Sequence, residues 1–209
     1  SDHIDSLPDP TVAAEIEKQL HFFHYLIQNR QLHNDRLHEL NTLRELYDFS
    51  IQIDSLEKPI ILEKLLERCL QEITVASAGW IGLWLEGEQV IRTALAKGYR
   101  NSNALLRIRF PQERWAIPCI VLENQSSMLI NDLNFASNYP LSAEELLHYQ
   151  SATGGMLPLG NLLVPLIHDD MSLGVLVLEN FNASQKIENR DLEWTNLLSA
   201  VASRALFKA

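Results

Sequence analysis

The sequence has little that would allow covalent or metal cross-linking. Only two cysteines, Cys69 and Cys119, occur in 209 residues, and both have apolar neighbours. Two cysteines are too few for a disulfide framework or for a zinc site built from cysteine alone. Low cysteine usage fits a reducing compartment, so we expect a cytoplasmic location.

Positive charge and long apolar runs are also scarce. The chain has 17 Lys and Arg against 27 Asp and Glu, which gives a formal net charge of −10. Nucleic acids and anionic membranes are bound by clustered Lys and Arg, so we expect neither as a partner. No apolar run approaches the ~20 residues of a membrane span, and no signal peptide is visible. The chain begins with Ser1, and we expect it to be a piece of a longer protein.

Motifs of catalysis are absent from the sequence. It contains no nucleophile elbow, phosphate-binding loop or Cys-x-x-Cys pair, whose chemistry depends on their spacing. His21 and His24 are three residues apart, which would place both on one helix face and allow shared metal ligation. We favour the alternative of a solvated helix face, because the sequence pattern does not place a third metal ligand next to this pair. We expect no enzymatic activity, cofactor or metal.

Two short apolar runs near the C-terminus predict a buried β-hairpin. The runs Leu162–Ile167 and Leu173–Leu178 flank the polar connection His168–Asp170, and Asp-Asp supplies turn chemistry. Both runs are almost continuously apolar, so both faces of this hairpin should be covered by helices. Pro165 cannot donate to a strand ladder, so it must face away from a neighbour or lie at a bulge.

The rest of the chain alternates helices with short strands. An amphipathic helix is predicted over Ile61–Ile73, a capped helix over Ser142–Ala152 and a closing helix over Asn189–Phe207. Strands are predicted at Gly79–Leu85, Gln89–Ala96, Leu105–Phe110 and Met128–Leu133, a helix interrupted by Pro118 at Gln112–Glu123, and a loop at Phe135–Leu141. Hairpins dominate, so the class is α+β with a mainly antiparallel sheet.

The N-terminal segment carries an apolar stripe with a polar interruption. The stripe fails across Gln28–Arg36, so the segment is either one long helix or two. Its apolar members are Ile16, Leu20, Phe23, Ile27, Leu37, Leu40, Leu43, Tyr47 and Ile51. This stripe needs a partner. We expect a parallel homodimer, with folding back onto the same chain as the alternative. We divide the chain into a helical segment, residues 1–54, and a domain, residues 55–209.

The C-terminal pattern resembles that of the GAF domain family. The resemblance rests on Val164–Leu166, then Gly174–Leu176, the polar end Glu179–Phe181 and the helix start Arg190–Leu192. Gly98 and Ile130–Asp132 also fit, and the resemblance covers about Ser55 to Ala209. Pro165 is a trait of that family.

The resemblance implies a fold and a role. It implies a six-stranded antiparallel sheet, with the terminal helices on one face and a small-molecule pocket on the other. GAF domains are commonly regulatory modules ahead of an output domain and are often dimeric through their terminal helices. We therefore expect a sensor in a larger signalling protein that binds an unknown small molecule. The alternative is a dimerisation or protein-docking module without a ligand.

The middle segment should supply the lining of such a pocket. We expect ligand contacts from an aromatic set with one carboxylate: Trp115, Asp132, Phe135, Tyr139 and Tyr149. Aromatic rings supply apolar walls, and a buried carboxylate needs a ligand donor as its partner. The alternative is core packing for the rings and turn capping for Asp132.

Specialised members of the resembled family are not matched. The helix Ser142–Ala152 lacks the cysteine that a bilin needs, and no Asn-Lys pair of the cyclic-nucleotide signature occurs. Cys119 is expected to be a buried structural thiol, and Cys69 lies on a helix stripe, away from the loops where methionine-sulfoxide reductases carry their cysteines. His148 and His168 are expected at the rim and in the exposed turn, rather than as haem ligands.

Overall fold

The computed structural model describes residues 36–37 and 39–209. The chain divides into two compact units, Ser1–Tyr47 and Asp48–Ala209. Residues 39–53 are helical, and the stripe residues Leu37, Leu40, Leu43 and Tyr47 are exposed. The first half of the expected stripe and the His21–His24 pair lie outside the described residues, as does all of the polar interruption except Arg36. No helix in the described part of the chain is long and apolar enough to cross a bilayer.

The second unit is built on one antiparallel sheet, as the sequence predicts. Its strands are β1 (Ala78–Leu85), β2 (Val90–Lys97), β3 (Arg109–Pro111), β4 (Met128–Ile130), β5 (Gly160–His168) and β6 (Met171–Asn180). Their order across the sheet is β3-β2-β1-β6-β5-β4, and every neighbouring pair is antiparallel. The β5–β6 hairpin therefore lies inside the sheet, which explains why its two runs are almost entirely apolar.

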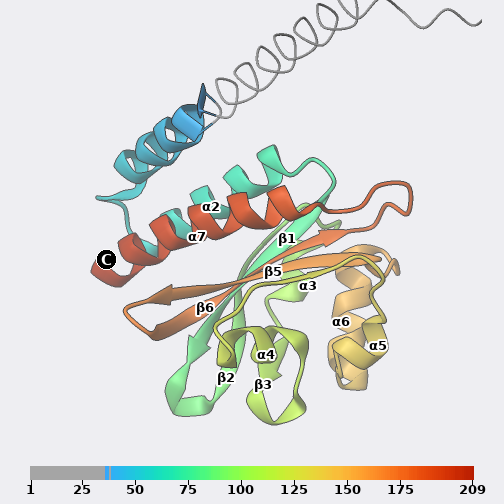
Figure 1. Cartoon of the computed structure of the whole chain (residues 1–209). Helices are drawn as coiled ribbons and strands as arrows, with labels where there is room; N and C mark the ends of the chain where they lie inside the picture. The colour runs from blue at the N-terminus through green and yellow to red at the C-terminus, as the bar shows by residue number, and fades with distance from the viewer. Residues whose placement is uncertain (1–35, 38) are drawn as a thin grey trace, which may run out of the picture. The chain divides into compact units, whose positions relative to one another are not determined.

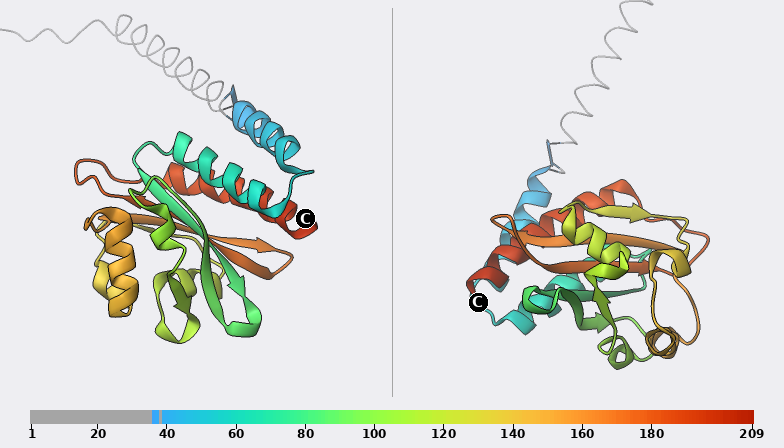
Figure 2. Two further views of the ribbon diagram at one scale, coloured as in Figure 1. Left: turned by 180° about the vertical axis from the view of Figure 1, so that it is seen from behind. Right: turned by 90° about the horizontal axis from the view of Figure 1, so that it is seen from below.

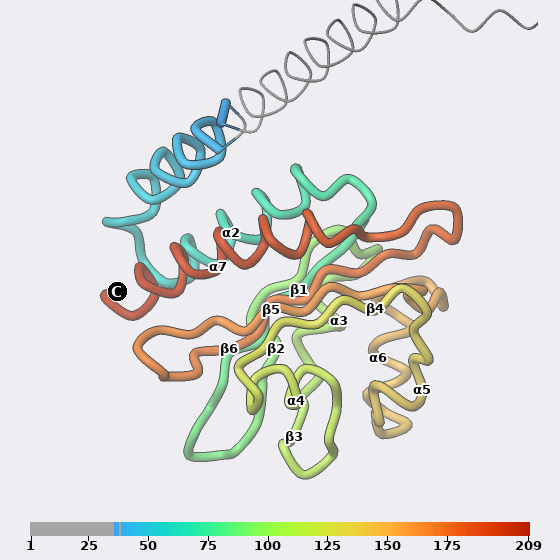
Figure 3. The backbone as a smooth tube through the Cα atoms, viewed as in Figure 1, coloured from blue at the N-terminus to red at the C-terminus, as the bar shows by residue number. Residues whose placement is uncertain are grey.

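Helices cover both faces of this sheet (Figure 1). The long helices α2 (Lys58–Glu72) and α7 (Asn189–Lys208) lie side by side on one face. The short helices α3 (Ser102–Leu105), α4 (Ile117–Glu123), α5 (Phe135–Asn138) and α6 (Ala143–Thr153) cover the other. The reverse view and the backbone trace show the same layers (Figures 2 and 3). The expected placement of the first and last helices of the domain on one face is confirmed.

The hairpin turn and Pro165 obey simple backbone rules. Asp169 and Asp170 both have positive φ, 47° and 63°, as a two-residue hairpin turn of the primed type requires. β4 begins at Met128, opposite Leu163, so β5 has no ladder partner on that side at Pro165. The proline therefore removes no hydrogen bond that β4 would need.

Two glycines allow backbones to approach closely. A Cβ atom at Gly174 would lie 2.2 Å from the carbonyl oxygen of Gly82 on the paired strand β1. Gly98, which directly follows β2, has φ of 83°, and a Cβ there would lie 2.3 Å from the carbonyl oxygen of Ser77. Neither position accepts a side chain without movement of the neighbouring backbone.

Short elements differ from the sequence prediction. The predicted strand Leu105–Phe110 is wrong in its first half, because Leu105 closes helix α3 and pairing begins only at Arg109. The predicted loop Phe135–Leu141 contains α5, whose N-cap Asn134 accepts a hydrogen bond from the backbone of Ser137. Pro118 does not interrupt a helix but lies in the first turn of α4, where a proline has no hydrogen bond to lose.

Candidate ligand-binding site

A buried carboxylate lies between the sheet and the short helices. Glu179, near the end of β6, has no exposed surface. Its Oε2 accepts hydrogen bonds from the hydroxyls of Tyr99 (2.7 Å) and Tyr149 (2.8 Å), and its Oε1 accepts one from the indole Nε1 of Trp80 (3.4 Å). Tyr149 comes from α6, Tyr99 from the segment after β2 and Trp80 from β1. One carboxylate thus ties three parts of the domain together.

The environment of Glu179 shifts its protonation towards neutral pH. Burial raises the pKa of this carboxyl to about 7, although the three donors act in the opposite direction. Burial and the nearby carboxylate raise the pKa of Tyr99 and Tyr149 well above the ordinary value, so both hydroxyls keep the protons that they donate. Among residues 36–37 and 39–209, no Lys, Arg or His forms an ion pair with Glu179. The charge is therefore held by neutral donors only.

Asn161 on β5 lies directly opposite Glu179 in the β5–β6 register. Its side chain is fully buried, and its Nδ2 donates to the hydroxyl of Tyr139 at 2.6 Å. Its Oδ1 is buried and has no hydrogen-bond partner in the described part of the chain. Unpaired buried polar atoms are rare in folded proteins and mark places that need a further partner.

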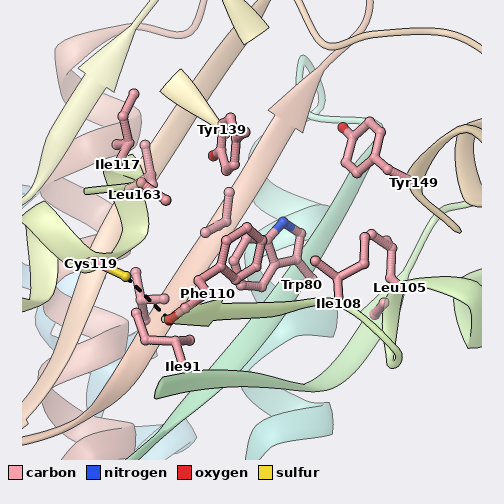
Figure 4. Packing of buried hydrophobic residues seen from close by; sticks show 14 of the residues in the cluster. Trp80, Ile91, Leu105, Ile108, Phe110, Ile117, Cys119, Tyr139, Tyr149 and Leu163 are labelled. Carbon is pink, nitrogen blue, oxygen red and sulfur yellow. Dashed lines mark hydrogen bonds between the residues drawn. The ribbon is translucent and has the colours of Figure 1, made fainter. Parts of the chain in front are cut away.

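Aromatic rings cover this polar pair. Phe135 stacks on Tyr139 at a centroid distance of 5.0 Å and contacts Tyr149 at 4.4 Å. Trp80 stacks on Phe110 at 5.1 Å. Figure 4 shows Tyr139, Tyr149, Trp80 and Phe110 in one buried layer. The position where the family resemblance implies a pocket is thus occupied in this structure by the chain's own rings.

The expected site residues divide into two groups. Phe135, Tyr139 and Tyr149 lie together in the layer next to Glu179. Trp115 and Asp132 do not reach it. Trp115 is 65% exposed and lines a surface groove of about 490 Å³ with Glu88, Glu113, Glu123 and neighbouring residues.

The expectation of a buried carboxylate at Asp132 is wrong. Its side chain is 93% exposed and faces Lys186 at 3.8 Å. It follows the short edge strand β4, so its side chain projects into water. The buried carboxylate of the domain is Glu179 instead, and sequence reasoning missed it together with Asn161, Tyr99 and Trp80. The available signal was a glutamate directly after the apolar run Leu173–Leu178.

Neither cysteine is poised for thiolate chemistry. Both are free and buried, and burial raises the pKa of each thiol to about 12. The Cys119 thiol donates to the carbonyl oxygen of Phe110 at 3.4 Å, the dashed line in Figure 4. A thiol must ionise before it attacks or binds a metal. Within the described ranges, no group of three or more His, Cys, Asp and Glu side chains is arranged to hold a metal ion.

The contacts of the two histidines of the domain are with residues other than Glu179. His148 faces Glu144 one turn away on α6 at 3.7 Å. His168 was expected to be exposed in the hairpin turn. It is instead largely buried, with its ring 4.5 Å from that of Phe207 on α7.

Comparisons with known proteins agree on the family. The GAF domain family model matches residues 55–206, and no curated protein matches the chain. The GAF domain of a phosphoenolpyruvate-protein phosphotransferase from Acinetobacter is 20% identical with a TM-score of 0.62, over 82% of this chain and 93% of that one. The corresponding domain from Coxiella burnetii is 16% identical with a TM-score of 0.65, over 81% and 95%.

An enzyme is also among the similar structures. The free methionine-R-sulfoxide reductase from Neisseria meningitidis, in complex with its substrate, is 14% identical with a TM-score of 0.55, over 78% of this chain and 86% of that one. At such identities these likenesses show the fold alone. The family model covers most of the chain, and its match agrees with the observed sheet and helices. The chain therefore belongs to the GAF domain family.

Proposed function

We propose that the chain is the sensor module of a larger cytoplasmic signalling protein, and that it binds a small molecule in the layer around Glu179. Domains of this family are mostly regulatory modules of signalling proteins. The observation that carries the proposal is the fully buried Glu179 opposite the unpaired Oδ1 of Asn161. The two buried thiols support a regulatory role over a cysteine-based reductase.

The energetics of burial favour a functional reason for this carboxylate. Removing a charged group from water costs several kcal/mol unless opposite charges or hydrogen bonds replace the lost solvation. Here the replacement consists of three neutral donors. A layer that only stabilised the fold would be at least as stable with an apolar residue at this position. Glu179 is better explained as a group that meets a ligand.

The connections of Glu179 give a route for the signal. Tyr149 links it to α6, and β6 leads from it through residues 181–188 into α7. At the other end of α7, Lys208 pairs with Asp54 at 2.8 Å, which joins the two ends of the domain. We propose that a ligand that displaces the rings over Glu179 changes the position of α7 and so reaches an attached output domain.

A thermal-shift screen tests this function. A ligand that binds only the folded state raises the melting midpoint. We expect at least one compound among nucleotides, tetrapyrroles and metabolites to raise the midpoint of the wild-type chain and of Glu113→Gln, an exposed control. The same compound should raise the midpoint of Glu179→Gln much less. A silent panel, or an equal shift in both variants, would contradict the proposal.

A second function is favoured by the filled layer. The rings of Phe135, Tyr139 and Tyr149 contact one another where a ligand would lie. This supports a ligand-free dimerisation or docking module, which would use the exposed stripe before the domain. A silent compound panel, together with a homodimer that depends on residues 1–47, would favour this second function over the first.

A further inference from the structure

We infer that the site around Glu179 takes a small organic cation, that is a protonated amine, amidine or guanidine, whose N–H groups donate to Glu179 and Asn161. This inference rests on the proposed function and names the chemical class of its ligand. It follows from two acceptors that face each other across neighbouring strands.

Glu179 and Asn161 both have free acceptor positions. Oε2 of Glu179 accepts two hydrogen bonds, while Oε1, within residues 36–37 and 39–209, accepts only that of Trp80, at the long distance of 3.4 Å. A carboxylate oxygen has lone pairs for two donors. The Oδ1 of Asn161 accepts none in the described chain. Both residues can therefore accept further hydrogen bonds, and the site needs a group that donates them.

The side chains of Glu179 and Asn161 are close enough to share one donor group. Directly opposed residues of an antiparallel pair have Cβ atoms about 4.5–5.5 Å apart and project from the same face of the sheet. The contacts of Asn161 with Tyr139 and of Glu179 with Tyr149 show that this face carries the short helices. One nitrogen with two or three N–H groups is suited to donate to both side chains.

The charge around Glu179 favours a cation as the ligand. The titratable groups that donate to Glu179 are Tyr99 and Tyr149, and the charge of Glu179 also acts on nearby Tyr139. Burial raises the pKa of all three hydroxyls. None supplies a positive charge. An anion would be repelled by the carboxylate, whereas a cation would neutralise it in surroundings of low dielectric constant, where the attraction is strong. The aromatic rings add a favourable surface for a cation.

The cover defines what binding must change. The ring centroids of Phe135 and Tyr149 lie 4.4 Å apart, and the Tyr149 hydroxyl donates to Glu179. A ligand must separate these two rings, which come from α5 and α6. A small cation attached to one apolar ring can take the space that a displaced aromatic side chain leaves.

The test uses three cations with uncharged or anionic counterparts of similar size. Benzylamine, benzamidine and phenylguanidine are titrated into the full chain by calorimetry at pH 6 and pH 8, beside benzyl alcohol, benzamide and benzoate. We expect at least one cation to bind at least tenfold more tightly than its counterparts. Its affinity should rise about tenfold from pH 6 to pH 8, because a carboxyl with a pKa of about 7 is mostly protonated at pH 6.

Variants separate this site from others. The pH dependence of the affinity should vanish in Glu179→Gln and persist in Glu113→Gln. Asn161→Leu should weaken the binding of the cation more than the binding of benzyl alcohol. The resonance of the Trp80 indole N–H, which donates to Glu179, reports the same event without relying on a variant that must fold.

The outcomes are distinct. Binding of benzyl alcohol or benzoate as tight as that of every cation overturns the inference and leaves the proposed function standing. No binding of any cation, while a neutral or anionic metabolite shifts the melting midpoint in the wider panel, also overturns the inference alone. If neither the six probes nor the panel binds, both the inference and the proposed function fail.

Discussion

Glu179 should make folding stability depend on pH in an unusual direction. Its pKa is raised from 4.5 to about 7 on folding, so the folded state binds more protons between these values than the unfolded state does. The free energy of unfolding should therefore fall as the pH rises from 4.5 to 7, by about 3 kcal/mol for this group. Urea denaturation at pH 5 and pH 8 measures the change.

Two variants isolate that effect. Glu179→Gln cannot ionise, so its free energy of unfolding should fall much less than that of the wild type between pH 5 and pH 8. Glu113→Gln, at an exposed position, should lose as much as the wild type. Parallel losses in the wild type and in Glu179→Gln would show that the carboxyl does not carry a raised pKa.

Tyr149 should stabilise the charged form of Glu179. Its hydroxyl donates to Oε2 at 2.8 Å, and a hydrogen bond to a charged group contributes about 1.5–3 kcal/mol. Tyr149→Phe should lose about that amount at pH 8 and less at pH 5, where the carboxyl is protonated. Tyr47→Phe is the matched control, because Tyr47 is 66% exposed. An equal loss at both pH values would contradict the account.

The residues of the site differ in how far the sequence reveals them. Aromatic side chains in the middle segment pointed to Phe135, Tyr139 and Tyr149, and these do lie together. Glu179 was missed because a polar residue after an apolar run resembles the end of a strand. Only the β5–β6 register shows that it faces Asn161 inside the protein.

Trp115 lies apart from the other expected rings. Its place among the aromatic residues of the middle segment suggested a pocket wall, and its backbone has φ of 52° where a short 3-10 turn ends. That conformation is uncommon for a bulky residue, and here the side chain is 65% exposed. A local backbone choice of this kind leaves no apolar periodicity in the sequence.

Among the secondary-structure elements, the pairing of β1 with β6 depends on Gly174, which is paired with Leu83 and lies close to the backbone of Gly82. A methyl group at Gly174 would lie 2.2 Å from the carbonyl oxygen of Gly82. Gly174→Ala should lower the free energy of unfolding by about 1–3 kcal/mol, the usual range for overpacking. Gly87→Ala is the control, because a Cβ there meets nothing within 4 Å. Urea denaturation compares the two, and equal stabilities would refute the close approach.

Helices and strands are predictable from the sequence when their own apolar pattern is long enough to determine them. The stripe of α2, the closing helix α7 and the apolar runs of β5 and β6 each carry a long period or a continuous apolar run, and each lies where expected. The segment Leu105–Phe110 alternates like a strand over its whole length. Leu105 nevertheless ends helix α3 and residues 106–107 form a turn, because tertiary packing overrides a weak local preference in short segments.

At the scale of the molecule, the stripe before the domain should drive dimerisation. Leu40, Leu43 and Tyr47 are each more than half exposed, and burial of a large apolar side chain contributes roughly 1.5–3 kcal/mol. Sedimentation should give a dimer for the full chain at micromolar concentration. A chain that starts at Asp48 should be a monomer; this start keeps Phe49 and Ile53, which belong to the domain core.

Two results would contradict the dimer. The first is a full-length monomer at that concentration, and the second is a dimer that survives removal of residues 1–47. Replacing Leu40 and Leu43 by glutamate in the full chain is the matched variant, since it places two charges in the apolar stripe without shortening the protein. We expect it to sediment as a monomer with an unchanged melting midpoint for the domain.

The most direct test of the whole account is a nuclear magnetic resonance titration of the full chain. It uses the compound that raises the melting midpoint most. We predict saturable shifts of the Trp80 indole N–H and of the Asn161 side-chain amide, whose partners lie around Glu179, while the exposed indole of Trp115 stays unchanged. Saturable shifts at Trp115 without any change at Trp80 would contradict it.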